Sequence, residues 1–249
     1  MKTPSHSFFI PKRQSAGAFT LMETVIAIGV LAVLLTGFIA VFTPAAQGIR
    51  RSISSEQADR LTTTLEMELA TLRANSESPA PAPAFATSFD KAFKWIQEGN
   101  KPTNAIFVYQ YRGDPTATPR TDGTPPPKVA ITGEPGKDYI VQSMARRLTD
   151  AELKNDLKAL EGSVFFVKPT QLRFTGGALN IGSVGQIRSA DNTIANNAAE
   201  YKEAVIAFSA EFHSVPTKSI AYLNSSTFTT RFNSTTNKPI FTRNLAVRR

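Results

Sequence analysis

The longest apolar run in the chain lies near its N-terminus. Residues 25–42 read VIAIGVLAVLLTGFIAVF, and no charged residue occurs from position 24 to position 49. At ~1.5 Å per helical residue this run spans ~27 Å, close to the ~30 Å hydrocarbon core of a bilayer. The pattern predicts a membrane-spanning helix whose large apolar side chains contact lipid or neighbouring protein: Val25, Ile26, Ile28, Val30, Leu31, Val33, Leu34, Leu35, Phe38, Ile39, Val41 and Phe42.

Basic residues precede this run and predict its orientation. Lys2, Lys12 and Arg13 favour a cytoplasmic N-terminus with the rest of the chain outside the cytoplasmic membrane. A cleaved secretory signal is one alternative, because residues 43–46 (TPAA) resemble a cut site, but the run is longer than such signals need. The charge-free length disfavours a buried core helix. An ordinary signal anchor remains open.

An amphipathic pattern continues the helix beyond the apolar run. Its apolar residues recur at three- and four-residue steps: Ile49, Ile53, Leu61, Leu65, Leu69 and Leu72. We therefore expect one helix over residues 19–75, with a transmembrane or assembly part at 19–45 and an amphipathic part at 46–75. Pro44 either bends this helix or ends a first helix at Thr43.

The remaining chain predicts a linker and a head domain. Residues 76–86 (SESPAPAPAFA) form a Pro/Ala linker, and residues 87–249 form the head. Helices are predicted at 88–97, capped by Ser88, and at 149–160, and strands at 105–111, 129–132, 139–142, 164–167, 172–174, 204–212, 219–223, 228–232 and 240–247, with an exposed loop at 114–128. The expected fold class is α+β: a long N-terminal helix packed on a C-terminal, mainly antiparallel β-sheet domain.

The chain offers few residues for catalysis or metal binding. It contains no cysteine and only two histidines, and one of these, His6, precedes the apolar run. This composition excludes His/Cys zinc cages and cysteine nucleophiles. His213 is expected on the surface or at a strand end. We predict no enzyme activity, no catalytic residue, no cofactor site and no metal site.

The acidic residues of the head do not indicate a metal site either. Asp150, Glu152 and Asp156 are expected on the solvated face of the second helix, among lysines. Asp191 and Asn192 lie in a loop that no cluster of carboxylates supports as a calcium site.

The charge is mildly basic, with 28 Lys+Arg against 20 Asp+Glu and a formal net charge of +8. Without Lys2, Lys12 and Arg13, which precede the apolar run, the net charge is +5. The remaining arginine pairs, at 50–51, 146–147 and 248–249, are scattered along the chain. Tyr109, Tyr111 and Arg112 on one strand have the chemistry to stack on bases, but a core role is favoured. DNA or glycan binding therefore has no support in the sequence.

A single carboxylate marks the entry to the apolar run. Residues 17–23 read Gly-Ala-Phe-Thr-Leu-Met-Glu, so Glu23 lies at the threshold of the helix. An acidic residue costs roughly 2.5–3.5 kcal/mol at the centre of a membrane helix, and a plain anchor has no use for it. If the chain is cut before Phe19, a neighbouring chain's new α-amine can pair with Glu23 and set the axial stagger between subunits.

This segment resembles the N-terminus of type IV pilins and the pseudopilins of type II secretion. Their motif is a small residue, the cut, and then Phe-Thr-Leu, an apolar residue and Glu. The resemblance covers residues 12–45 and implies that a prepilin peptidase removes the leader, residues 1–18, and methylates the new N-terminus. It also implies Glu23 as the assembly carboxylate. The family usually has Gly before the cut, whereas Ala18 intervenes here, so cuts after Gly17 or Ala18 are both open, and the spacing to Glu23 favours Ala18/Phe19.

The resemblance predicts a structural subunit, minor or specialised, of a type IV pilus or a secretion pseudopilus. Its expected partners are the cytoplasmic membrane, other pilin-like subunits, the prepilin peptidase and the assembly platform, with the head in the periplasm and later in the filament or at the cell surface. The alternative is a membrane-anchored or surface binding module, adhesive or DNA-binding, that uses the same export signal. Nothing in the residues separates a pilus from a pseudopilus.

Overall fold

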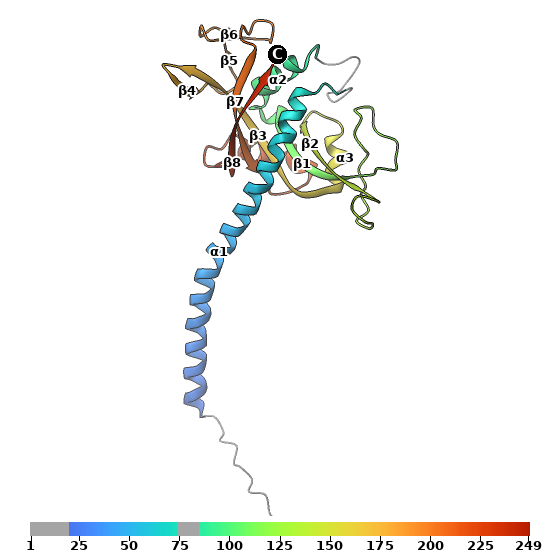
Figure 1. Cartoon of the computed structure of the whole chain (residues 1–249). Coiled ribbons are helices and arrows are strands. Elements are labelled where there is room, and N and C mark those ends of the chain that lie inside the picture. The colour runs from blue at the N-terminus through green and yellow to red at the C-terminus, as the bar shows by residue number, and fades with distance from the viewer. Residues whose placement is uncertain (1–19, 74–84) are drawn as a thin grey trace, which may run out of the picture. The chain divides into compact units, whose positions relative to one another are not determined.

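One helix, α1 (Leu21–Ala70), contains both the apolar run and the amphipathic stripe. The computed structural model describes residues 20–73 and 85–249, and the chain divides into two units at Ile49 (Figure 1). Pro44 lies inside α1, so the alternative in which a first helix ends at Thr43 is wrong. A proline within a helix removes one hydrogen bond to the preceding turn, and the neighbouring turns continue here without it.

The head, residues 87–249, is built on an antiparallel sheet and forms one unit with the part of α1 that begins at Arg50. Five strands follow the order β2-β1-β3-β7-β8, and β4 extends the sheet by pairing with β3. The bounds are β1 (Ile106–Gly113), β2 (Ile140–Arg147), β3 (Leu160–Thr175), β4 (Ala178–Ile181), β7 (Val205–Ser214) and β8 (Phe241–Arg248), and a separate small pair joins β5 (Ile187–Arg188) to β6 (Ile194–Ala195). The helices are α2 (Ser88–Glu98), α3 (Leu153–Asp156), α4 (Ile220–Leu223) and α5 (Ser226–Asn233), with 3-10 turns η1 (Pro102–Asn104) and η2 (Leu157–Ala159). This architecture is the α+β class that the sequence predicts.

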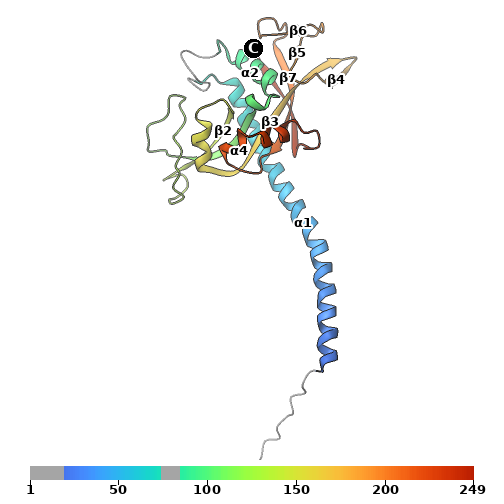
Figure 2. The same ribbon diagram turned by 180° about the vertical axis from the view of Figure 1, so that it is seen from behind.

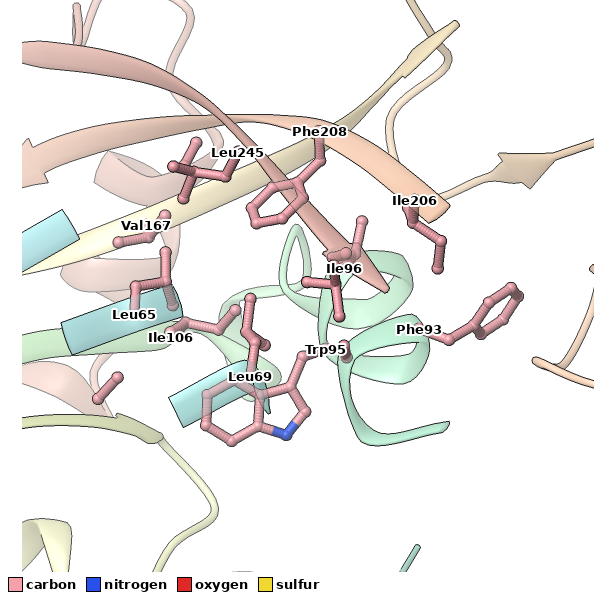
Figure 3. Close-up of a cluster of buried hydrophobic side chains, with 14 of the residues drawn as sticks. Leu65, Leu69, Phe93, Trp95, Ile96, Ile106, Val167, Ile206, Phe208 and Leu245 are labelled. Carbon is pink, nitrogen blue, oxygen red and sulfur yellow. The ribbon is translucent and has the colours of Figure 1, made fainter. Parts of the chain in front are cut away.

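Both faces of the sheet are covered, and each has its own core. On one face Leu61, Leu65 and Leu69 of α1 are buried with Trp95 of α2 and with side chains of β3, β7 and β8 (Figure 3). On the other face Phe107, Tyr109, Tyr111 and Phe166 pack with residues of α3, α4 and α5. Figure 2 shows the sheet from the side on which α4 lies. Since successive strand residues point to opposite faces, β1 feeds both cores and is buried along nearly its whole length. The apolar positions of 61, 65 and 69 are therefore a docking stripe, whereas Ile49, Ile53 and Leu72 are exposed.

A buried lysine of α2 closes the C-terminal end of α1. The Lys91 ammonium donates to the carbonyls of Glu68 (2.8 Å) and Thr71 (2.9 Å) and to the Glu68 carboxylate (2.5 Å). The last carbonyls of a helix have no partners within the helix, and a cation there also opposes the negative end of the helix dipole. Arg73 donates to the second Glu68 oxygen at 2.7 Å. These bonds account for an α1 that ends at Ala70 rather than at residue 75, and those from Lys91 tie α1 to α2.

Strand β3 replaces two predicted strands. We expected separate strands at 164–167 and 172–174, but β3 runs through both and through Pro169 between them, which pairs with Ala210 of β7. The amide position of Pro169 faces the side of β3 that β1 occupies only as far as Val167. No ladder bond is lost at that point. Proline is therefore tolerated there, although up to Val167 β3 is a central strand between β1 and β7.

Several predicted elements of the head are wrong. Residues 219–223 and 228–232 form helices α4 and α5 rather than strands, because Ser225 caps α5 at the Phe228 amide and Phe228 and Phe232, four apart, both pack on Phe166. Residues 129–132 form no strand. The predicted helix at 149–160 shortens to α3 and η2 because Leu160 already belongs to β3, and α3 has no side-chain cap. The cap of α2 is Thr87 rather than Ser88, in a capping box with Asp90.

Candidate functional site: the apolar N-terminal helix

The first turn of α1 is capped by Thr20. The backbone N–H of Glu23 donates to the Thr20 hydroxyl (3.3 Å) and to the Thr20 carbonyl (3.0 Å). Thr-x-x-Glu is the sequence signature of a capping box, and a carboxylate in the first turn also complements the positive end of the helix dipole. Glu23 is thus suited to the start of this helix in addition to any role between subunits. The cap at Thr20 is not among the sequence-based expectations, although the Thr-x-x-Glu spacing signals it.

The apolar run carries its side chains outward. All twelve predicted contact residues are more than half exposed, from 54% at Val30 to 73% at Val33. Burying one such side chain is worth about 1.5–3 kcal/mol. One described helix, α1, is long and apolar enough to cross a membrane, and its most apolar 18 residues reach a mean hydropathy of 2.8 with none buried. Contact with lipid or with other protein would therefore stabilise this apolar surface.

The polar groups of this segment are satisfied within the helix. The hydroxyls of Thr24, Thr36 and Thr43 donate to carbonyls three or four residues earlier, at 2.8–2.9 Å. Such internal bonds remove the cost of placing a hydroxyl in hydrocarbon. Gly29 and Gly37 have no atom within 4 Å of the position a side chain would occupy, so another helix has room to approach there.

The predicted cleavage residues cannot be placed. Gly17, Ala18 and Phe19 lie outside the described residues, as does most of the predicted linker. The candidate site that the structure does describe is therefore the capped start of α1 at Glu23 and the exposed apolar helix that follows it.

A second cluster of chemistry-bearing side chains lies in the head and corrects two predictions. Arg146 is 1% exposed and contacts three carboxylates: Asp122 (2.7 Å), Asp150 (2.8 Å) and Asp156 (2.8 Å). We expected Asp150 and Asp156 on a solvated helix face, but both are buried. A charge that leaves water needs a charged partner, and the folded chain supplies that partner to all four groups.

The Arg146 cluster fixes the long connection between β1 and β2. Thr124 lies beside Arg146 Nη2 at 3.2 Å, and Arg120 of the same connection pairs with Asp156 at 2.5 Å. Tyr111 donates to the Pro125 carbonyl at 2.8 Å. The predicted exposed loop at 114–128 is therefore wrong in part, because Asp122 and Thr124 within it are buried. Asp122 lies in this connection and Asp156 pairs with its Arg120, while Asp150 pairs with Arg146 and accepts from the Glu152 N–H. These contacts indicate a structural role for the cluster.

Acidification is expected to stabilise the head through Asp150. Burial, opposed by Arg146, raises the pKa of Asp150 to about 6, from an unfolded value near 3.8. Because the folded state binds this proton more tightly, the Asp150 contribution to stability grows as pH falls from about 7 to about 4. The pKa of Asp122 is lowered in the folded state, so its contribution to stability is lost only as the pH falls further, through its unfolded value near 3.8 and on to the lower folded value.

The test compares the wild-type chain with Asp150→Asn in detergent. The wild type should gain stability relative to this variant between pH 7.5 and pH 5, read as the difference between their melting temperatures at each pH. His213 acts in the opposite direction in the same window, because burial lowers its pKa to about 4, but it is common to both chains and cancels. A difference that does not change with pH would contradict the assignment.

His213 lies near the end of β7, as the strand-end alternative predicts, but it is a core residue rather than a surface residue. It is 2% exposed and stacks on Phe166 with a ring separation of 4.8 Å and an interplanar angle of 5°. The alternation of β7 places it on the same face as α5, which covers it. Tyr109 and Tyr111 are also buried, as the favoured core interpretation predicts.

No group of three His, Cys, Asp or Glu residues that could hold a metal ion occurs in residues 20–73 and 85–249. Asp191 instead accepts hydrogen bonds from Thr193 and pairs with Lys202 at 2.5 Å. Comparison with known proteins adds no relative: no family model, curated protein or solved structure matches the chain.

Proposed function

We propose that this chain is a structural subunit, minor or specialised, of a type IV pilus or a type II secretion pseudopilus. It is inserted in the cytoplasmic membrane with its head outside, is processed by a prepilin peptidase, and assembles through α1. The observation that carries the proposal is a capped helix start with one carboxylate, Glu23, directly before the charge-free part of α1, residues 24–49, whose large apolar side chains are exposed. The order of residues 19–23 supports the family assignment.

In the proposed mechanism the apolar part of α1 is surrounded first by lipid and then by other subunits. In the membrane the residues of 25–42 contact lipid, and in the filament they contact the α1 helices of other subunits. Glu23 pairs with the amine at Phe19 of a neighbour, which offsets the cost of a carboxylate in an apolar environment. The amphipathic half of α1 stays docked on the head through Leu61, Leu65 and Leu69.

The N-terminal sequence of the mature protein tests this proposal. In cells with an active prepilin peptidase we expect the chain to begin at methylated Phe19, and in cells without the peptidase at Met1. Ala18→Leu places a bulky residue at the cut and should block processing, whereas Ser15→Leu in the same leader should not. A mature chain beginning at Ala46 would indicate a secretory signal and sink the proposal.

The binding-module alternative predicts the same export but no assembly. Electron microscopy of cells with and without the protein, with antibody labelling of the head, separates the two. Label along filaments or a pilus defect supports the subunit. Label confined to the membrane, with saturable ligand binding, supports the module.

A further inference from the structure

The β3–β4 hairpin extends beyond the rest of the sheet. β3 pairs with β7 as far as Gln171, and its last residues, Leu172 to Thr175, pair with β4 alone (Figures 1 and 2). Gly176 and Gly177 form the two-residue turn with φ values of 62° and 80°, as a tight hairpin turn requires. β4 has β3 as its one strand partner among the described residues.

One face of this hairpin is apolar and exposed. Phe174 lies opposite Leu179, and Leu172 lies opposite Ile181, so these side chains share a face. Phe174 is 74% exposed, Leu179 53% and Ile181 68%, and Val184 just beyond β4 is 67% exposed. Contiguous apolar residues of this kind on a soluble domain typically mark an interaction surface.

The outer edge of β4 also has unpaired main-chain groups. The Gly182 N–H donates to the Gln171 carbonyl at 2.7 Å, which places the even-numbered residues of β4 in the bonds to β3. The N–H and C=O groups of Leu179 and Ile181 therefore face away from β3. This edge is a template for another strand.

Nothing in the sequence of β4 blocks such pairing. Edge strands are usually protected by charged residues, proline or bulges. β8, the edge strand at the end of the sheet order, carries Arg243 and Arg248, whereas β4 reads Ala-Leu-Asn-Ile. The β4 edge is thus unprotected, and its lack of charge removes repulsion between two copies.

We propose that β4 pairs antiparallel with β4 of a second copy of this chain, with Leu179 opposite Ile181 of the second copy. In this register Asn180 lies opposite Asn180 of the second copy, so the contact is its own complement under a two-fold axis. The outward groups of Leu179 and Ile181 bond to the same groups of the second copy, and apolar residues meet apolar residues. A one-residue shift would set Leu179 against Asn180 and lose this match.

The contact is small, and its strength depends on tethering. A four-residue strand pair buries less than the ~1,200 Å² of a stable interface, so free heads in solution should pair weakly. Two chains anchored in one membrane have a higher effective concentration and should pair detectably. The proposal does not depend on the assembly role of α1.

Disulfide cross-linking of the full chain in membranes tests the register, because the chain has no cysteine of its own. In Asn180→Cys the two thiols lie at a directly opposed, non-hydrogen-bonded pair, with Cα atoms ~4.5 Å apart, which suits a disulfide. In the matched control Ala178→Cys the two thiols are about 13 Å apart along the strands and cannot bridge. We expect mild oxidation to convert the first variant to dimer about ten-fold faster than the second.

A blocking variant separates pairing from chance collision. Adding Leu179→Lys to Asn180→Cys leaves the bonds to β3 intact, because the Leu179 main-chain groups face outward, and should reduce dimer formation about ten-fold. Equal cross-linking of the two cysteine variants, an unaffected Leu179→Lys double variant, or an adduct with a different protein would each overturn the second-copy proposal.

Discussion

Replacing Arg146 with methionine is expected to destabilise the head by about 3–5 kcal/mol, because removal of one partner of a buried ion pair leaves uncompensated charge behind. Here three carboxylates, Asp122, Asp150 and Asp156, would lose a common partner, although Asp156 would keep its ion pair with Arg120. The Tyr109 hydroxyl, which donates to Asp156 at 2.7 Å, would remain as a neutral donor and cannot replace the guanidinium. The connection between β1 and β2 should loosen with it.

The measurement is chemical denaturation of the full chain in detergent, followed by tryptophan fluorescence of the buried Trp95. Arg60→Met is the matched control, because Arg60 makes an ion pair of 2.6 Å with Glu56 but both side chains are exposed. Exposed pairs four apart contribute about 0.3–0.5 kcal/mol, so the control should stay near the wild type. A cost below about 1 kcal/mol for Arg146→Met would show that the cluster does not hold the fold.

Replacing Glu23 with glutamine is expected to reduce incorporation into filaments by about 30-fold or more, while insertion in the membrane and head stability stay unchanged. The reason is that breaking a desolvated charge pair costs about 2–5 kcal/mol, and 2 kcal/mol corresponds to about 30-fold. Glutamine preserves the capping geometry with Thr20, since Gln replaces Glu in a capping box. The loss would therefore reflect the charge alone.

Glu23→Leu and Glu56→Gln complete this test. Leucine removes the charge and the polar side chain but keeps the main-chain N–H that donates to Thr20. Glu56 is an exposed carboxylate farther along the same helix. Quantitative immunoblots of sheared filaments should show loss for both Glu23 variants and wild-type incorporation for Glu56→Gln. If the glutamine variant assembles normally and only the leucine variant fails, the function of Glu23 is to start the helix, and the assembly role is wrong.

Periodicity predicted the elements whose apolar residues follow one clear helical or strand spacing. The run at 25–42 and the stripe at Leu61, Leu65 and Leu69 were read as one helix, since apolar residues at helical spacing have one straightforward explanation. β1, β7 and β8 were likewise predicted close to their observed bounds. The errors lie at residues 219–232, where short apolar and β-branched stretches fit a strand as well as a helix. The Ser225 cap and the four-residue spacing of Phe228 and Phe232 decide for a helix.

The Arg146 cluster could not be predicted from the sequence. Asp122 and Arg146 are separated by 24 positions and meet only when β2 and the preceding connection pack together. Taken one at a time, aspartate and arginine are residues that usually face solvent, and so Asp150 and Asp156 were assigned to a surface. The Thr20–Glu23 capping contact, in contrast, is local, and its signature was already present in the sequence.

The closure of α1 by Lys91 also determines how the protein bears a mechanical load. A pull along α1 reaches the head through the buried Leu61, Leu65 and Leu69 and, at Glu68, through the bonds from Lys91, and these contacts must all give way in shear. Bonds loaded side by side yield together rather than one after another. The end of α1 is therefore a force-bearing joint, and it achieves this without a disulfide, in a chain that contains no cysteine.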